Sequence, residues 1–460
     1  MIGSTRRHAA VLAAKSSGTL LRLAGRGGTA LPGLLAERID PAIVAGLAGG
    51  LARGAALVTG TNGKTTTSAL IASALRAGGL VPIHNVAGSN MMRGLAATLC
   101  AAAGWNGRLP TGRRGVGILE VDEAVAPIAA RAIRPRVVVI TNLFRDQLDR
   151  YAELETVAAL WRKMAEELVG ATLVLNADDP LVGALPTPPD GRRIFYGIDD
   201  RSAAGPPGAA DSIWCPRCST QLEFLAIWYA HLGDYRCPGC GYTRPVLDVA
   251  AREVRPAGFD GADLCLSVAG RALAVRLPLP GLYNVSNALA AFAGALAMGV
   301  PSEMAARALA ATRPAFGRTE QSRIDGREVA ILLVKNPTGF DRDDQHRSGR
   351  KRHPRPAAGP QRPDCRRSRR ILDLGCRLRT TCRQSRRDHR HRRSCGRTRL
   401  RPEVCRCHRR CRRAGCRAGP RLALGRRSGR LCVLPTYTAL IDLHSSLADR
   451  AGVARFWERR

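Results

Sequence analysis

The feature that most constrains the fold is a glycine-containing turn between an apolar strand and a helix. Residues 55–59 form a short apolar strand pattern, and residues 68–77 follow the period of a helix. A turn in this position directs backbone N–H groups and the positive end of a helix at a phosphate group. We therefore expect an α/β nucleotide-binding domain. Its predicted phosphate-binding residues are Gly60, Thr61, Asn62, Gly63, Lys64, Thr65 and Thr66.

Two side chains of the turn have separate predicted roles. Lys64 would contact the outer phosphates through its ammonium group, and the Thr65 hydroxyl would be a ligand of Mg²⁺. The common pattern G-x-x-x-x-G-K-[ST] is incomplete, because Val58 occupies the place of its first glycine. A surface turn that has this sequence by chance is the alternative, and the flanking strand and helix argue against it.

Further strand and helix patterns alternate after the turn. Apolar runs typical of strands occur at 116–121, 136–141 and 172–176. Helical patterns occur at 91–103, 124–133 and 154–168. This alternation predicts a parallel sheet covered on both faces, with ligands at the carboxyl ends of its strands.

Polar side chains gather where these strands end. They are Glu120, Asp122 and Glu123, then Asn142, Asp146 and Asp149, then Asn176, Asp178 and Asp179. Taken singly, each acid is readily explained as a helix cap or a solvated loop residue. Taken together beside a phosphate-binding turn, they favour a Mg²⁺ site, because Mg²⁺ takes oxygen ligands.

A cysteine pattern interrupts the α/β sequence. Four cysteines have the spacing C-x2-C-x18-C-x2-C: Cys215, Cys218, Cys237 and Cys240. This spacing is typical of a tetrahedral zinc site, and Gly239 and Gly241 would permit a tight turn around the last cysteine. Four thiolates fill the coordination sphere, so we expect a structural Zn²⁺ in an inserted zinc ribbon at 211–245. Free or oxidised thiols are the alternative.

Most of the positive charge lies in one interval. The 460 residues carry a formal net charge of +35, and residues 341–430 hold 31 Arg and one Lys against seven acidic residues, with eight of the 15 Cys. A basic tail that binds nucleic acid is one interpretation. We favour compensating reading-frame errors in GC-rich coding DNA, because the interval has no period and nothing that could form a core. Its edges are abrupt, with a strand pattern at 329–334 and ordinary globular sequence at 431–441.

Short motifs in a fixed order resemble those of the Mur ligase family. They are Gly60-Thr-Asn-Gly-Lys-Thr65, Leu119-Glu-Val-Asp122, Thr141-Asn-Leu-Phe-Arg-Asp-Gln-Leu-Asp149, Leu175-Asn-Ala-Asp-Asp-Pro180, Gly281-Leu-Tyr-Asn-Val-Ser-Asn287 and Phe316-Gly-Arg318. The cysteine insertion, with the segments 142–150 and 334–340, resembles the MurT branch of that family. The similarity breaks over 341–430 and resumes at 431, which supports the frame-error hypothesis.

The resemblance implies a domain organisation and roles for site residues. It implies an N-terminal segment at 1–50, a Mur-ligase-like ATP-binding domain at 51–312 and a C-terminal α/β ligase domain at 313–460, disrupted by 341–430. The implied cofactors are ATP, Mg²⁺ and structural Zn²⁺. Lys64 and Thr65 would hold the phosphates and Mg²⁺, Glu120 would be a metal ligand, and Asn287 and Arg318 would hold the nucleotide. The implied catalytic residues are Lys64, Glu120 and Arg318.

The same resemblance implies an activity and a partner. ATP would activate the D-glutamate α-carboxylate of lipid II as an acyl phosphate, and ammonia would convert it to D-isoglutamine. A glutamine amidotransferase subunit of the GatD type would supply the ammonia as part of a heterodimer. The aspartate that such chains lend to their partner would fall within 341–430. We expect a cytoplasmic protein, with peripheral contact at the inner face of the membrane, since no export signal or apolar run near twenty residues occurs and the mean hydropathy is -0.12.

Three departures from the family pattern bear on these roles. Gln147 stands where ligases that add amino acids often have histidine. Lys163 lies one residue from the place of the carbamylated lysine of many ligases and is more readily explained as a surface residue. Lys335-Asn-Pro337 replaces a longer nucleotide-contacting segment.

Two other functions remain open at the level of sequence. One is a Mur ligase that adds an amino acid to a cell-wall precursor. The other is a nucleic-acid-binding P-loop ATPase that uses the zinc ribbon and the basic interval, although we expect no nucleic-acid partner.

Resequencing the gene across codons 335 to 435 tests the frame hypothesis. We expect two compensating shifts whose correction restores family-like sequence between 341 and 430. A polypeptide made as printed would have a damaged C-terminal domain and little or no lipid II amidation. A clean read of the printed frame, or amidation by the printed polypeptide with its partner, contradicts the hypothesis.

Overall fold

The computed structural model describes residues 2–23, 30–85, 89–110, 112–144, 153–205, 214–312, 319–324, 327–332 and 431–433. The chain divides into two compact units, and the first contains the described residues up to Glu320. Three short strands of the C-terminal region form a separate sheet in the order β12 (Thr319–Ile324), β13 (Arg327–Leu332), β14 (Leu431–Val433). The interval 341–430 lies outside the described residues.

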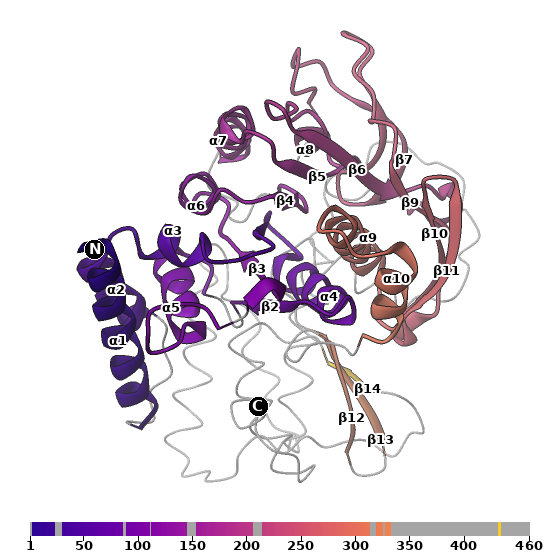
Figure 1. Cartoon of the computed structure of the whole chain (residues 1–460). Helices are drawn as coiled ribbons and strands as arrows, with labels where there is room; N and C mark the ends of the chain where they lie inside the picture. Colours follow the sequence, from indigo (N-terminus) through magenta and orange to yellow (C-terminus); the bar gives the residue numbers. More distant parts are fainter. Residues whose placement is uncertain are drawn as a thin grey trace, which may run out of the picture. The chain divides into compact units, whose positions relative to one another are not determined.

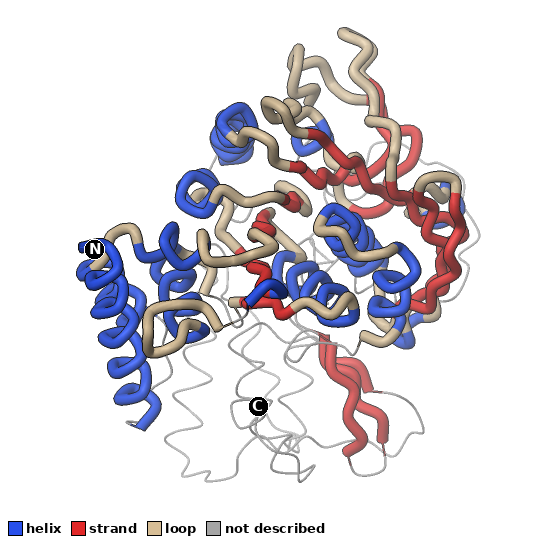
Figure 2. The backbone as a smooth tube through the Cα atoms, in the orientation of Figure 1, coloured by secondary structure: helices blue, strands red, loops and turns tan. Residues whose placement is uncertain are grey.

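A nine-stranded sheet forms the centre of the first unit within the described residues (Figures 1 and 2). Its order is β11-β10-β9-β6-β5-β4-β1-β3-β2. The strands from β2 to β9 in this order run parallel, and β10 and β11 add an antiparallel edge. The bounds are β1 (Ala55–Thr59), β2 (Val81–His84), β3 (Gly115–Glu120), β4 (Val137–Ile140), β5 (Thr172–Asn176), β6 (Arg192–Ile198), β9 (Val249–Pro256), β10 (Ala262–Val268) and β11 (Arg271–Leu277).

Helices cover both faces of this sheet, as the alternating pattern predicts. One face packs against α4 (Lys64–Ala77), α9 (Leu282–Ala297) and α10 (Ser302–Ala310). On the opposite face, one core includes residues of α5 (Met92–Ala102), α6 (Ala126–Ile133), α7 (Glu153–Glu167) and α3 (Ile43–Ala48), and α1 (Ile2–Leu23) and α2 (Ala30–Ile39) join it by packing on α5. Along β1, Ala56 and Val58 belong to the first core, while Ala55 and Leu57 belong to the second. Burial on both faces explains why the strand is apolar throughout.

Strand pairing places the predicted site at one edge of the sheet. β1 lies between β3 and β4, and Val58 is in register with Glu120 on one side and with Val139 on the other. All three strands are parallel, so their carboxyl ends open at the same edge. The turn after β1 therefore lies between the residues that follow β3 and those that follow β4.

Helix α4 begins four residues earlier than the sequence pattern predicts. Gly63 is its N-cap residue, in the left-handed conformation with φ of +86°, and Lys64 is the first helical residue. The pattern missed this turn because residues 64–67 are Lys and three Thr, which carry no apolar periodicity. Lys64, Thr65 and Thr66 consequently lie on the first turn of α4, where backbone N–H groups have no intrahelical acceptor.

The cysteine-rich insertion forms a small module between β6 and β9. It contains the antiparallel hairpin β7 (Glu223–Tyr229) and β8 (Leu232–Arg236). Tyr235, Tyr242 and Leu222 pack with two of the cysteines in a core of their own. The Tyr242 hydroxyl donates to the Pro180 carbonyl at 3.0 Å, which attaches the module to the short helix α8 (Pro180–Gly183).

In the described ranges before β1, the chain forms three helices. α1 packs on α2, and both contact α5. Val11, Val44 and Leu47 are buried in the same core as the sheet. No helix in the described ranges is long and apolar enough to cross a bilayer.

His84, at the end of β2, makes the stability of the fold sensitive to acid. Its Nε2 lies 3.0 Å from the Ser68 hydroxyl of α4, and burial, with a smaller contribution from Arg76, lowers its pKa to about 4. The unfolded chain takes up this proton near pH 6.5, whereas the folded chain does so only near pH 4. Stability is therefore lost as pH falls through this window, by about 2 kcal/mol between pH 7 and pH 5.

His84→Gln, which keeps a polar partner for Ser68, should remove most of this pH dependence. The measurement is the thermal unfolding midpoint at pH 7 and pH 5 for both proteins. A midpoint that falls equally in wild type and variant contradicts the assignment.

Candidate active site

The turn of residues 60–66 is fixed to the end of β4 by its backbone. The Thr61 N–H donates to the Asn142 carbonyl at 2.9 Å, and the Asn62 N–H donates to Asn142 Oδ1 at 2.9 Å. In return, Asn142 Nδ2 donates to the Asn62 carbonyl at 3.0 Å, and the Thr141 hydroxyl donates to the same carbonyl at 2.8 Å. The contacts of the turn with the end of β4 are thus made by backbone, amide and hydroxyl groups that carry no net charge.

Glycine is required at two positions of the turn. Gly60 has φ of +128°, and a Cβ there would collide with the Thr141 hydroxyl. Gly63 has φ of +86°, and a Cβ there would collide with Asn287 Oδ1. These close approaches bring Asn287, on α9, directly against the start of α4.

Lys64 folds back over its own turn. Its ammonium group donates to the Gly60 carbonyl at 2.5 Å and to Glu123 Oε2 at 3.0 Å. Both charged side chains are mostly buried, with 12% exposure for Lys64 and 17% for Glu123. The Trp161 ring N–H, from α7, donates to the Glu123 carbonyl at 3.0 Å and fixes the backbone of that partner. A phosphate that approaches the first turn of α4 would replace Glu123 as the counterion of Lys64.

Glu120, at the end of β3, offers an oxygen suited to a cation. It is 4% exposed; its Oε1 accepts from the Thr65 hydroxyl at 3.1 Å, and its Oε2 has no hydrogen-bond partner among the described residues. A buried carboxylate oxygen without a partner is costly, and a cation satisfies it. The residues therefore fit Mg²⁺, which Glu120 and Thr65 would hold beside the turn.

Asn85, which sequence patterns did not single out, fixes the backbone of Glu120. Its Oδ1 accepts from the Glu120 N–H at 2.7 Å, and its Nδ2 donates to the Glu120 carbonyl at 2.8 Å. It follows β2, a strand that contains Pro82 and has an exposed first residue, so no alternating pattern marked the site. Had β2 been assigned from the sequence, the polar Asn85 directly after it would have indicated a residue of the site.

Asn287 lies in the interior of the first unit. It is 6% exposed, and its Nδ2 donates to Asn284 Oδ1 at 3.2 Å. Asn284 in turn donates to the Pro280 carbonyl at 2.8 Å. This pair holds the Asn287 amide in place beside Gly63.

Other acids at the strand ends serve the scaffold. Asp122 accepts from the Ala124 N–H at 3.1 Å in a local turn. Asp178 pairs with Arg244 at 2.5 Å, and Asp179 caps α8. No direct hydrogen bond joins Asp178 or Asp179 to the turn within the described residues: Asp178 also accepts from the Ile198 N–H, and Asp179 also accepts from the Leu143 N–H, in the segment after β4. Lys163 is exposed on α7.

Several predicted positions lie outside the described residues. They are Asp146, Gln147, Asp149, Arg318 and Lys335. Their roles remain predictions.

The four cysteines form a compact cluster. Their sulfur atoms all lie within 4.8 Å of one another; Cys215 and Cys240 are 3.6 Å apart, and Cys218 and Cys237 are 3.4 Å apart. A tetrahedron of Zn–S bonds near 2.3 Å places sulfurs about 3.8 Å apart. The cluster therefore fits Zn²⁺. The four sulfurs would fill all four coordination positions and leave none open.

Each of the two turns that carry these cysteines contains a residue with positive φ. Ser219, after Cys218, has φ of +59°, and Gly241, after Cys240, has φ of +72°.

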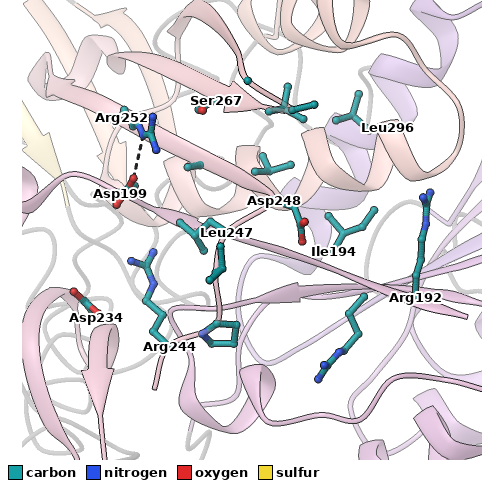
Figure 3. A pocket seen from close by; sticks show the side chains of 18 residues that line it. Arg192, Ile194, Asp199, Asp234, Arg244, Leu247, Asp248, Arg252, Ser267 and Leu296 are labelled. Atoms are coloured by element: carbon teal, nitrogen blue, oxygen red, sulfur yellow. Dashed lines mark hydrogen bonds and ion pairs between the residues drawn. The ribbon is translucent and has the colours of Figure 1, made fainter. Parts of the chain in front are cut away.

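A cavity of about 850 Å³ lies elsewhere on the first unit, between β6, the segment before β9 and the β10–β11 turn (Figure 3). None of its lining residues belongs to the turn at 60–66 or bonds to it. Its charged groups are largely paired: Arg252 donates to Asp199 at 3.0 Å, and Arg244 is engaged by Asp178. We assign no ligand to it.

Comparison with known proteins agrees with the geometry of the site. A family model described as the Mur ligase middle domain matches residues 58–210. The MurT subunit of lipid II isoglutaminyl synthase (glutamine-hydrolyzing) from Streptococcus pneumoniae (strain ATCC BAA-255 / R6) is 35% identical over 335 residues, which are 72% of this chain and 71% of that protein. The chain belongs to the Mur ligase family, in its MurT branch. The MurT subunit from Staphylococcus aureus (strain COL) is 31% identical over 338 residues, 73% of this chain and 72% of that protein.

A solved structure shares the fold. The pseudomurein peptide ligase type C from Methanothermus fervidus superposes with a TM-score of 0.51 at 26% identity, over 63% of this chain and 56% of that one. Membership of the Mur ligase family implies the use of ATP, so the turn at 60–66 is the expected place for its phosphates.

Gly63→Ala should weaken binding of Mg²⁺ and ADP roughly tenfold or more, because the new Cβ collides with Asn287 and strains the first turn of α4. Isothermal titration calorimetry gives the dissociation constant. Gly79→Ala is the matched control: its φ is +76°, but no described atom lies within 4 Å of the added Cβ. Equal losses in the two variants, or no loss in Gly63→Ala, contradict the role given to the turn.

Proposed function

We propose that this chain is the ATP-dependent synthetase subunit that amidates the D-glutamate α-carboxylate of lipid II. The observation that carries the proposal is the pairing of two features. One is a phosphate-binding turn whose Lys64 and Glu120 are arranged for a nucleotide and a cation. The other is similarity to MurT subunits over about 72% of the chain. The proposal places the protein in peptidoglycan synthesis, with lipid II as its substrate.

The reaction requires activation of a carboxylate. A carboxylate oxygen of D-glutamate attacks the γ-phosphorus of ATP, the bond from that phosphorus to the bridging β–γ oxygen breaks, and ADP leaves. The product is an acyl phosphate. Ammonia then attacks the carbonyl carbon, the C–O bond to phosphate breaks, and a proton is lost from nitrogen, which leaves D-isoglutamine and inorganic phosphate.

The residues of the turn would stabilise the first of these steps. Negative charge spreads over the transferred phosphoryl group, and donors aimed at that group lower the barrier. The first-turn N–H groups of α4 and the Lys64 ammonium are such donors. A bound Mg²⁺ neutralises phosphate charge, and Glu120 and Thr65 would hold it. Glu123 would release Lys64 to the γ-phosphate, and the predicted roles of Asn287 and Arg318 complete the nucleotide contacts.

The ammonia would come from a separate glutamine amidotransferase of the GatD type, bound as a heterodimer. Five of the described cysteines are poorly suited to be the nucleophile of a glutaminase. Cys100 is fully buried, and burial raises the pKa of its thiol to about 12, so it is unsuited to be a nucleophile. Cys215, Cys218, Cys237 and Cys240 are committed to the metal cluster. We propose a cytoplasmic location, with the chain meeting lipid II at the inner face of the membrane.

The test is amidation of lipid II by the chain, translated from a verified reading frame, with its partner, glutamine, ATP and Mg²⁺. Mass spectrometry follows amidated lipid II, and a coupled assay follows ADP. Lys64→Ala should lower both rates by roughly a hundredfold or more, because it removes a cation that faces the developing charge. Lys163→Ala, on the exposed face of α7, should leave them unchanged.

Two results contradict the proposal. One is undiminished ATP consumption by Lys64→Ala. The other is ATP consumption that responds to a free amino acid and a soluble cell-wall precursor but not to lipid II and ammonia, which would indicate a ligase that adds an amino acid.

A further inference from the structure

The tip of the hairpin in the cysteine module is buried in the ATP-binding domain. Ala230, with φ of +50°, and His231 connect β7 to β8. His231 and Leu232 are both 0% exposed. The Gly233 N–H donates to the Asp178 carbonyl at 2.9 Å, which anchors the tip to the segment after β5. The module is therefore not a surface appendage along its whole length.

The His231 side chain lies against the segment that follows β4. Its ring centroid is 4.7 Å from that of Phe144, with the planes tilted by 58°. Its Nε2 is 3.5 Å from Asp179 Oδ2, and this same oxygen accepts from the Leu143 N–H at 2.8 Å. His231 thus contacts the pair Leu143–Phe144 in two ways. Its ring packs on Phe144, and it lies against Asp179, which holds the Leu143 N–H.

The pair Leu143–Phe144 is in turn bonded to the phosphate-binding turn. The Phe144 N–H donates to the Thr61 hydroxyl at 3.0 Å, and that hydroxyl donates to the Phe144 carbonyl at 3.1 Å. The preceding residue, Asn142, holds the backbone of Thr61 and Asn62. Every step from His231 to Thr61 is a contact between buried or partly buried groups.

A polar ring is an expensive way to fill this space. Neither nitrogen of His231 has a hydrogen-bond partner among the described residues. Burial of an unsatisfied polar group costs free energy that Leu or Phe at the same position would avoid. The charged neighbour of the ring is Asp179, the carboxylate that holds Leu143. What a histidine has here and an apolar residue lacks is a ring nitrogen 3.5 Å from that carboxylate.

We propose that His231 is a positioning residue for the nucleotide-binding turn, and that through it the cysteine module sets the affinity for the phosphates of a nucleoside triphosphate. The inference rests on the proposed function, since it requires that nucleotide bind at residues 60–66. His231 faces Asp179, which holds the Leu143 N–H, and packs on Phe144, which is hydrogen-bonded to Thr61.

The position of the cysteines extends this argument to the metal. Cys237 follows β8 directly, six residues after His231, which is about 20 Å along an extended strand. Tyr235 of the same strand packs in the core of the cysteine cluster. A metal bound by the four thiols would order β8 and so fix the position of its other end.

The experiment uses the full chain and measures the dissociation constant of a non-hydrolysable ATP analogue with Mg²⁺ by calorimetry, together with the melting temperature and zinc content. His231→Leu and His231→Phe remove the polar edge that faces Asp179. His231→Gln keeps an amide nitrogen at about the place of Nε2. Trp214→Ala, an exposed residue of the same module, is the control.

We expect His231→Leu and His231→Phe to weaken binding roughly tenfold, because Thr61 is no longer held in place, with His231→Gln within about threefold of wild type and Trp214→Ala unchanged. In turnover, the KM for ATP should rise more than kcat falls. Removal of zinc with a chelator should weaken analogue binding in the wild type. The same treatment should cause a smaller loss of affinity in His231→Leu.

Three results overturn the inference. The first is wild-type affinity in a folded His231→Leu or His231→Phe protein. The second is a loss of affinity that follows the fall in melting temperature to the same degree in the Leu, Phe and Gln variants. His231 would then have a structural role only. The third is an analogue affinity of the Lys64→Ala variant that equals that of the wild type. This result refutes the proposed function as well.

Discussion

The site depends on the parallel pairing of β1 with β3 on one side and β4 on the other. This pairing fixes the turn at 60–66 between Glu120 and Asn142, which lie at the ends of β3 and β4, the two strands that flank β1 in the sheet. Asn142 holds the turn through backbone and amide hydrogen bonds, and Glu120 meets Thr65 from the opposite side. A shift of register in either pair would separate the backbone proposed to bind phosphate from the proposed metal ligand Glu120, so the proposed chemistry depends on the sheet topology.

The buried charges beside the turn are arranged for a ligand that brings both negative and positive charge. Lys64 is held by Glu123, while Glu120 has one oxygen without a hydrogen-bond partner in the described structure. A nucleotide with a cation would satisfy both, since its phosphates would replace Glu123 as the partner of Lys64 and its metal would lie against that Glu120 oxygen. The same elements connect the turn to the cysteine module through Phe144 and His231, so an insertion far along the chain supports the site.

The sequence predicted the features that depend on local pattern. β1 and β5 were located to the residue, and the cysteine spacing predicted the cluster, because strand apolarity and metal-ligand spacing are local signals. Patterns that depend on tertiary contacts were missed. The start of α4 depends on Gly63 rather than on apolar period, and the roles of Asn85 and His231 arise from residues brought together only by folding. Asp178 and Asp179 follow a strand as a metal ligand would, yet Asp178 pairs with Arg244 of the cysteine module and Asp179 caps α8.

A crystal structure with Mg²⁺ and a non-hydrolysable ATP analogue tests the central claim most directly. We predict that the γ-phosphate accepts a hydrogen bond from Lys64, that the contact of Lys64 with Glu123 is broken, and that Glu120 Oε2 faces the metal. An analogue bound away from the first turn of α4, or bound there with the Lys64–Glu123 pair intact, would contradict the account.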